Sequence, residues 1–475
     1  MTSTFFNTGT IMIKSIGRQS TVFLAVILFA VGCNVSTDSD IRTDSLPSDP
    51  LIARSFYSGF EQAGTTWIGI SAVSDGKIYY VLSTTDLEHG ARFYRFNPDT
   101  EETEFLFDLT EASGESDMNA ILQGKSHAPF FEKDGKLYIS THVGVHGSIA
   151  EGEEAITHDG YEPYPGGHLL TYDLTTGDVE DLGIPVEGEG ILTMTMDVDR
   201  GHIYGITWPR GHFFHYDVNT GDLINKGLVS ENGEAGNRAG GSDFRVLGRA
   251  MFVDPADGTV YYTTAEGDIF SYSPYTESIS RVEGVSLKLN YFGTYDYTQP
   301  GSMAYNWREI VWYPEEEVAY GVHGNSGYLF RFDPRKPGIE LVDRIASNPS
   351  KKSGMYDQHP YGYLGFDLGP DGHTLYYLTG GPIYVDGQRV SRDNVEELGL
   401  KRRETENVHL VTYHIPTGTY RDHGPLFYDD GSRVTGSQSI AVAADGTVYT
   451  LADFEYNGKE ISDLVQILPP AKIRK

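Results

Sequence analysis

Short hydrophobic runs alternate with polar turns along most of the chain, and one phrase recurs. An Asp-Gly type of turn, a spacer, an aliphatic residue and a tyrosine follow one another, as in Asp75–Tyr79 and Asp445–Tyr449. Seven copies are present, two of them degenerate, and consecutive tyrosines lie 56 to 73 residues apart: Tyr79, Tyr138, Tyr204, Tyr261, Tyr320, Tyr376 and Tyr449. A repeat of this length with this turn chemistry predicts one β unit per copy, and these tyrosines are expected to be structural.

Each unit contains further strand-like runs around the repeated tyrosine. An apolar run such as ILTMTMDV or RAMFVDP precedes each turn, and a second phrase such as FFHYDVNTG follows each of the first six tyrosines. A further strand comes after the second phrase, and no stretch has helical periodicity over ten residues. Four strands per unit and seven units predict an all-β fold, a seven-bladed β-propeller of four-stranded blades.

The seventh unit lacks its fourth strand because the chain stops soon after the run DLVQIL. The apolar run LIARSFYSGF, from Leu51 to Phe60, precedes the first unit and has no other assignment. We therefore expect it to supply the outer strand of blade seven, which removes an otherwise open sheet edge. The ring is then closed by an N-terminal strand, and residues 51–475 form one propeller domain.

The segment before residue 51 has the pattern of an export signal. Residues 21–31 form an eleven-residue apolar run, too short to span a bilayer, with two basic residues before it and small residues leading to Cys33. This pattern predicts a signal peptide over residues 1–32 and a lipidated tether over residues 33–50, with Cys33 as the lipidation site. The expected location is the outer membrane or cell surface, in contact with membrane only through the lipid. Ordinary secretion, to the periplasm or beyond, is the alternative.

Composition narrows the possible partners. The chain has 36 Lys and Arg residues against 67 Asp and Glu, a formal net charge of −31, and loss of residues 1–32 removes two positive charges and gives −33. Such a charge argues against nucleic acid as a partner. The single cysteine excludes disulfides within the chain and cysteine-based zinc clusters. An anionic ligand would therefore need a local basic site.

Such a basic site is predicted at one face of the ring. In a propeller, the residues where inner strands begin and second strands end converge on the mouth of the central channel. At these positions the chain places His127, His142 and His146 in blade two; Trp208, Arg210 and His212 in blade three; Arg249 in blade four; Tyr305, Trp307, Arg308 and His323 in blade five; and His359, Tyr361 and Tyr363 in blade six. Arginine binds carboxylate or sulfate in a bidentate way, and tyrosine and tryptophan stack on sugar rings. The alternative is that these side chains only satisfy backbone groups in the channel.

The runs SHAPFF, THVGVH, YPGGHLLTYDLTTG, GITWPRGHFFHYD and GRAMFVDPADGTVYYTTAEGDIFSY resemble those of the seven-bladed, propeller-type ulvan lyases, and cover blades two to four best. The resemblance implies a secreted or lipid-anchored lyase that acts on a uronic-acid-containing, sulfated polysaccharide. In that family a histidine and a tyrosine move protons, and an arginine or a second histidine neutralises the uronate. His127 and His146 match the histidine pair, Arg249 or Arg210 is the arginine, and Tyr305 is the candidate tyrosine. The expected substrate-binding residues are Trp208, Arg210, His212, Arg308, His359 and Tyr361.

The implied reaction is β-elimination, in which a base removes the C5 proton of a uronic acid and an acid protonates the departing 4-oxygen. It requires no organic cofactor, and we expect a monomer. A structural divalent metal ion on His142, His146 and His168 remains an alternative, although a loop gives the i, i+4 pair no fixed geometry. Two other function classes remain: a non-catalytic propeller that binds glycan or protein, and a metal-dependent hydrolase or lactonase.

Overall fold

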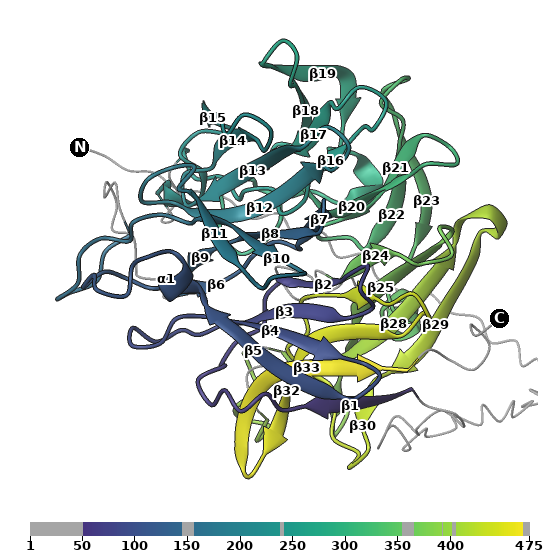
Figure 1. Cartoon of the computed structure of the whole chain (residues 1–475). Helices are drawn as coiled ribbons and strands as arrows, with labels where there is room; N and C mark the ends of the chain where they lie inside the picture. Colours follow the sequence, from purple (N-terminus) through teal and green to yellow (C-terminus); the bar gives the residue numbers. More distant parts are fainter. Residues whose placement is uncertain are drawn as a thin grey trace, which may run out of the picture.

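The computed structural model describes residues 51–144, 156–237, 242–353, 365–391, 393–400 and 405–468. Seven antiparallel sheets follow one another in chain order around a ring (Figure 1). The predicted seven-bladed propeller is therefore confirmed. Six of the sheets have four strands and the seventh has five. In each blade the innermost strand is the one nearest the central channel.

The blades comprise the following strands, from the inner to the outer edge. Blade one has β2 (Ile70–Ala72), β3 (Ile78–Leu82), β4 (Arg92–Asn97) and β5 (Glu102–Asp108), and blade two has β7 (Phe131–Lys133), β8 (Lys136–Ser140), β10 (Leu169–Asp173) and β11 (Val179–Gly183). Blade three has β12 (Gly190–Asp197), β13 (His202–Trp208), β14 (His212–Asp217) and β15 (Leu223–Leu228), and blade four has β16 (Phe252–Val253), β17 (Val260–Thr263), β18 (Asp268–Ser273) and β19 (Ser278–Ser286).

Blade five has β20 (Trp307–Tyr313), β21 (Val318–His323), β22 (Tyr328–Phe332) and β23 (Ile339–Arg344), and blade six has β24 (Phe366–Leu368), β25 (Thr374–Pro382), β28 (Glu406–His414) and β29 (Thr419–Pro425). Blade seven has β31 (Ala441–Val442), β32 (Val448–Tyr456), β33 (Lys459–Ile467), β1 (Ile52–Phe56) and β30 (Phe427–Tyr428). The connections carry the short elements α1 (Leu109–Ala112), β6 (Gln123–Lys125), β9 (His142–Val143), η1 (Gly233–Ala235), η2 (Asn290–Phe292), α2 (Asn348–Ser353), β26 (Tyr384–Val385), β27 (Gln388–Arg389) and η3 (Ile415–Thr417).

The repeated phrase forms a tight turn followed by a buried tyrosine. In blade one, an Asp75 carboxylate oxygen accepts a hydrogen bond of 3.0 Å from the backbone N–H of Lys77, and Gly76 has a φ of +80°. That backbone conformation strains any residue with a Cβ, which explains the glycine. The Tyr79 hydroxyl donates to the other Asp75 oxygen at 3.0 Å. The tyrosine therefore fastens its strand to the turn, as expected for a structural residue.

The ring is closed by the N-terminal strand, as predicted. β1 pairs antiparallel with β33, with Ala53 opposite Ile467 and Phe56 opposite Leu464. Beyond β1, Ser58 donates through its backbone N–H and its hydroxyl to one Asp463 oxygen, both at 2.7 Å. The other edge of β1 pairs in parallel with β30, which belongs to the connection between blades six and seven. Both edges of the closing strand are therefore hydrogen-bonded.

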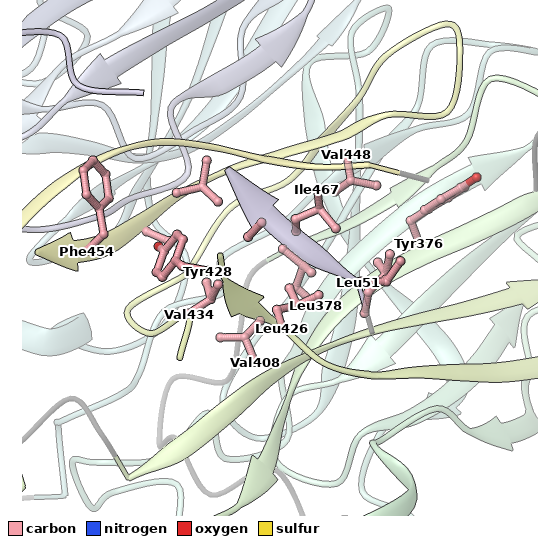
Figure 2. Packing of buried hydrophobic residues seen from close by; sticks show 14 of the residues in the cluster. Leu51, Tyr376, Leu378, Val408, Leu426, Tyr428, Val434, Val448, Phe454 and Ile467 are labelled. Carbon is pink, nitrogen blue, oxygen red and sulfur yellow. The ribbon is translucent and has the colours of Figure 1, made fainter. Parts of the chain in front are cut away.

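Closure also completes a hydrophobic core between blades six and seven. Leu51 and Ala53 are buried there with residues from both blades, among them Tyr428 and Ile467. Figure 2 shows β1 crossing this cluster, with Leu51, Leu378 and Ile467 close together. Burying apolar side chains contributes roughly 1.5–3 kcal/mol for each large one. The N-terminal strand is thus part of the core as well as of the sheet.

Candidate functional site

The connections at the two faces of the ring differ in length. At one face, inner and second strands are joined by tight turns, such as residues 134–135 between β7 and β8 and residues 198–201 between β12 and β13. At the other face the connections are long, for example residues 229–251 between blades three and four. Loops that are held by a rigid scaffold are where binding and catalytic residues concentrate. We therefore call this second side the long-loop face.

Four rings from three blades form a row at the long-loop face. The ring of His127 lies 4.9 Å from that of Trp67 and 5.7 Å from that of His142, measured between centroids. His142 in turn lies 5.5 Å from Trp208. This aromatic row brings His127 and Trp208 into one site, as the sequence predicts, and adds Trp67 before the inner strand of blade one.

His127 is held in one tautomer. Its Nδ1 lies 2.8 Å from the carbonyl oxygen of Leu192, and because a carbonyl can only accept, Nδ1 carries the proton. Burial lowers the pKa of His127 well below its usual range, and the positive charges of Lys125 and Arg249 lower it further. The imidazole is therefore neutral, and its Nε2 carries the lone pair.

Lys125 lies beside this row and was not predicted as a site residue. It ends β6, which pairs with β9 so that Lys125 is opposite His142. The two short strands approach closely: a Cβ on Gly124 would lie 2.4 Å from the Cα of Gly144. Lys125 is 1% exposed, and its Nζ lies 3.8 Å from the centre of the Trp67 ring. Burial and the nearby Arg249 lower the pKa of this amine well below its usual range.

Arg249 is fixed by a buried carboxylate. Its Nη2 donates to Glu234 Oε1 at 2.6 Å, and its Nη1 donates to the carbonyl of Leu247 at 2.8 Å. The other Glu234 oxygen accepts from Nε1 of Trp208 at 2.9 Å. Burial alone would raise the pKa of Glu234, but the arginine and these hydrogen bonds outweigh it and lower the pKa. Arg249 is thus a charged group of the site, already paired with one anion.

Glu234 owes its position to a glycine before it. Gly233 has a φ of +55°, and a Cβ there would lie 2.4 Å from the carbonyl oxygen of Arg210. The backbone N–H of Glu234 donates to the carbonyl of Pro209 at 2.8 Å. The η1 turn is therefore packed tightly against the end of β13, which carries Trp208. Arg210 contributes backbone to this packing.

The remaining predicted residues lie at other places. Tyr305 is 2% exposed, and its hydroxyl accepts from the backbone N–H of Tyr295 at 3.0 Å. Arg308 is buried on β20 and donates to the sulfur of Met303 at 3.1 Å. His212 begins β14 and bonds Asn225 at 3.2 Å through Nδ1. The predicted residues His146, His359, Tyr361 and Cys33 lie outside the described residues.

His168, a ligand in the alternative metal site, is instead held between two carboxylates. Its Nε2 lies 2.9 Å from Glu115 and its Nδ1 lies 3.0 Å from Asp181. Burial alone would lower the pKa of His168, but these two partners outweigh it and raise the pKa to about 9. Over the residues that the structure describes, no group of three or more His, Cys, Asp or Glu side chains is arranged to hold a metal ion.

This network predicts a pH dependence of stability. The folded-state pKa of His168 is above the ordinary value of about 6.5, so its stabilisation is complete below pH 6.5 and is lost as the pH rises to about 9. We expect the Tm to fall between pH 6.5 and 9, and to fall less in His168→Gln. His414→Gln, on the opposite face, is the matched control and should keep the wild-type slope. Equal slopes in all three proteins would contradict the prediction.

No helix in the described ranges is long and apolar enough to cross a membrane. No protein-family model matches the chain, and no curated protein matches it in sequence. Among solved structures, a candidate 6-phosphogluconolactonase from Bacteroides uniformis is similar, with a TM-score of 0.41 and 10% identity over 79% of this chain and 95% of that one. A chain of the mitotic checkpoint complex has a TM-score of 0.45 and 11% identity over 94% of this chain and 99% of that one.

Proposed function

We propose that the protein is an exported polysaccharide lyase that cleaves a uronic-acid-containing polymer by β-elimination at the long-loop face. The observation that carries the proposal is His127: a neutral imidazole with Nδ1 anchored, beside the two basic side chains Lys125 and Arg249. A base that is neutral near pH 7 and oriented by a second hydrogen bond is what proton abstraction requires. The resemblance to propeller-type ulvan lyases, with a sulfated substrate, supports the same chemistry.

In this proposal each group has one role. Nε2 of His127 takes the C5 proton of the uronate as that carbon–hydrogen bond breaks. The electron pair moves toward the carboxylate, the double bond forms between C4 and C5, and the bond from C4 to the departing oxygen breaks. Arg249 stabilises the growing negative charge, which is electrostatic stabilisation of the transition state, and the amine of Lys125 can donate a hydrogen bond to the same group. His142, in the same aromatic row, is the candidate acid for the departing oxygen, and His146 and Tyr305 are further candidates.

A non-catalytic glycan-binding propeller is the second candidate, and the enclosure of the site favours it. His127 is 4% exposed and Arg249 is 7% exposed, and Arg249 is already paired with Glu234. A polymer would have to reach these groups through the loops of the face, whereas a binding protein could contact the loops alone. Both candidates share an anionic polysaccharide as the partner.

One assay separates the candidates. The form that begins at Cys33 is incubated with sulfated and unsulfated uronate polysaccharides, and the absorbance of the unsaturated uronate product is followed. A lyase produces this absorbance together with new reducing ends. New reducing ends without the absorbance would indicate a hydrolase, and polysaccharide binding without either would indicate a binding protein. Expression with residues 1–32 present, followed by membrane fractionation, tests the proposed export and the lipid anchor at Cys33.

A further inference from the structure

The proposed reaction uses the wall of the central channel only at Arg249, and the rest of this cavity has no role in it. Its volume is about 470 Å³, and all seven blades contribute to its wall through their inner strands and the residues before them. Most of the lining residues are apolar, with Ile70, Phe131, Met194, Met251 and Trp312 among them, although about half of the surface that faces the cavity is polar. A cavity of this size and lining falls in the range of sites for small organic molecules.

Two carboxyl groups from neighbouring blades interrupt this apolar wall. Glu309 is on β20 of blade five and Asp367 is on β24 of blade six, and both line the cavity. Oε1 of Glu309 is inaccessible to solvent and has no hydrogen-bond partner among the described residues. Oδ1 of Asp367 accepts a hydrogen bond of 2.8 Å from the backbone N–H of Leu368. Because Oε1 is out of reach of the channel, a ligand there would meet the other carboxyl oxygens of the pair, and among the described residues the Leu368 N–H is the donor to them.

The charged groups around Glu309 and Asp367 do not provide both carboxyl groups with a cationic partner. Enclosure raises the pKa of Asp367 to about 6. It also raises the pKa of Glu309 well above its usual range; the neighbouring Arg308 opposes this rise, and Asp367 adds to it. The other charged group in the channel wall, Arg249, is paired with Glu234. Glu309 and Asp367 are both half-buried, and a carboxylate in such an enclosed position is costly without a cationic partner, so a positive charge placed beside both groups would be favoured.

We propose that the channel binds a small organic cation, an amine or ammonium group on an apolar body, with the positive charge between Glu309 and Asp367. The apolar wall then takes the body of the ligand, and the aromatic residues among the lining can contact its charged end. This site is separate from His127 and does not depend on the protein being a lyase. An alcohol of the same shape would lose the charge interaction, and a carboxylate would be repelled.

The test compares three probes of one shape: n-hexylamine, n-hexanol and n-hexanoate. Binding is measured by calorimetry and by the shift in Tm at pH 7.5. We expect the amine to bind and raise the Tm, and the alcohol to bind at least about tenfold more weakly. In Glu309→Gln/Asp367→Asn the affinity for the amine should fall by about tenfold or more. Glu315→Gln, an exposed carboxyl in the next turn of blade five, is the matched control and should bind like wild type.

Several outcomes would overturn the proposal. Equal binding of hexanol and hexylamine would mean that the carboxyls take no part, and no binding by any probe would mean that the channel holds water only. A rise in Tm with Ca²⁺ or Mg²⁺ but not with the amine would indicate a metal site instead. If the double variant does not fold, Asp367→Asn alone serves, because it retains Glu309 and should still weaken amine binding. Unchanged amine affinity in that folded variant would also count against the site.

Discussion

Deletion of residues 51–60 is expected to lower the free energy of unfolding by at least about 5 kcal/mol. The deletion removes β1 from between β33 and β30, so β33 loses its outer neighbour and β30 loses the strand with which it pairs. It also removes the buried side chains of Leu51 and Phe60, and truncating one such residue costs about 2–5 kcal/mol. Most single domains have only about 5–15 kcal/mol of stability. The Tm and urea unfolding of the form without these residues measure the effect.

Two point variants separate packing from pairing in this prediction. Phe60→Ala leaves the strand in place and should cost about 3–5 kcal/mol because Phe60 is buried against blades one and seven. Arg54→Ala is the control: Arg54 lies on β1, but its ion pair with Glu101 is exposed and should contribute less than about 1 kcal/mol. A deletion with the same Tm as Arg54→Ala would contradict the assignment of β1 as the closing strand.

The second large effect concerns the site. His127→Asn is expected to reduce kcat of the proposed lyase by about 10²–10⁴-fold. The asparagine amide can still donate to the Leu192 carbonyl but cannot accept a proton as a base. His414→Ala, on the tight-turn face, should keep wild-type kcat. Initial rates from the unsaturated-product absorbance measure both variants. Full activity in His127→Asn would mean that His127 is not the base. His146 and Tyr305 would then be the next candidates.

The role of Arg249 has to be tested with a double variant, because Arg249 stabilises the fold through its ion pair and also supplies charge to the site. Arg249→Ala alone would leave Glu234 buried without its cation, which costs about 3–5 kcal/mol. The guanidinium of Arg249 is buried together with the carboxylate of Glu234, so Arg249 contributes to stability as well as to the charge of the site. Arg249→Met combined with Glu234→Gln removes both charges. We expect this pair to be nearly as stable as wild type and to lose turnover more than substrate affinity.

The fold was predictable from the sequence because the turns and strands that define each blade are marked by short sequence patterns that repeat along the chain. The turn and the tyrosine of the repeated phrase recur in all seven blades, two of them in degenerate form, and the unassigned run at Leu51–Phe60 matched the missing strand in blade seven. β30 escaped prediction because two residues, Phe427 and Tyr428, carry no recognisable strand pattern. Their pairing with β1 depends on how the connection between blades six and seven runs.

The site was predictable only in part, for a related reason. His127, Trp208 and Arg249 come together because strand ends converge in any propeller, and sequence position gives those ends. Lys125 and Glu234 lie in connections between blades, outside the repeated phrases. Their positions depend on the close approach at Gly124 and on the turn at Gly233, which are contacts between segments distant in sequence. The signal in the sequence that could have indicated Lys125 as a site residue was its position two residues before His127.

Closure by the first strand also sets the order of events during synthesis. Ser58 and Asp463, which are bonded across the seam, are 405 residues apart, so β1 has no partner until the last blade has been translated. At about 5–20 residues per second, β1 waits for roughly 20–80 s. Blades one to five can assemble in that interval through contacts between neighbours, while Leu51 stays exposed and Phe60 lacks its contacts with blade seven. The nascent chain is therefore an open arc for most of its synthesis, and its two ends are the surfaces that a chaperone would have to protect.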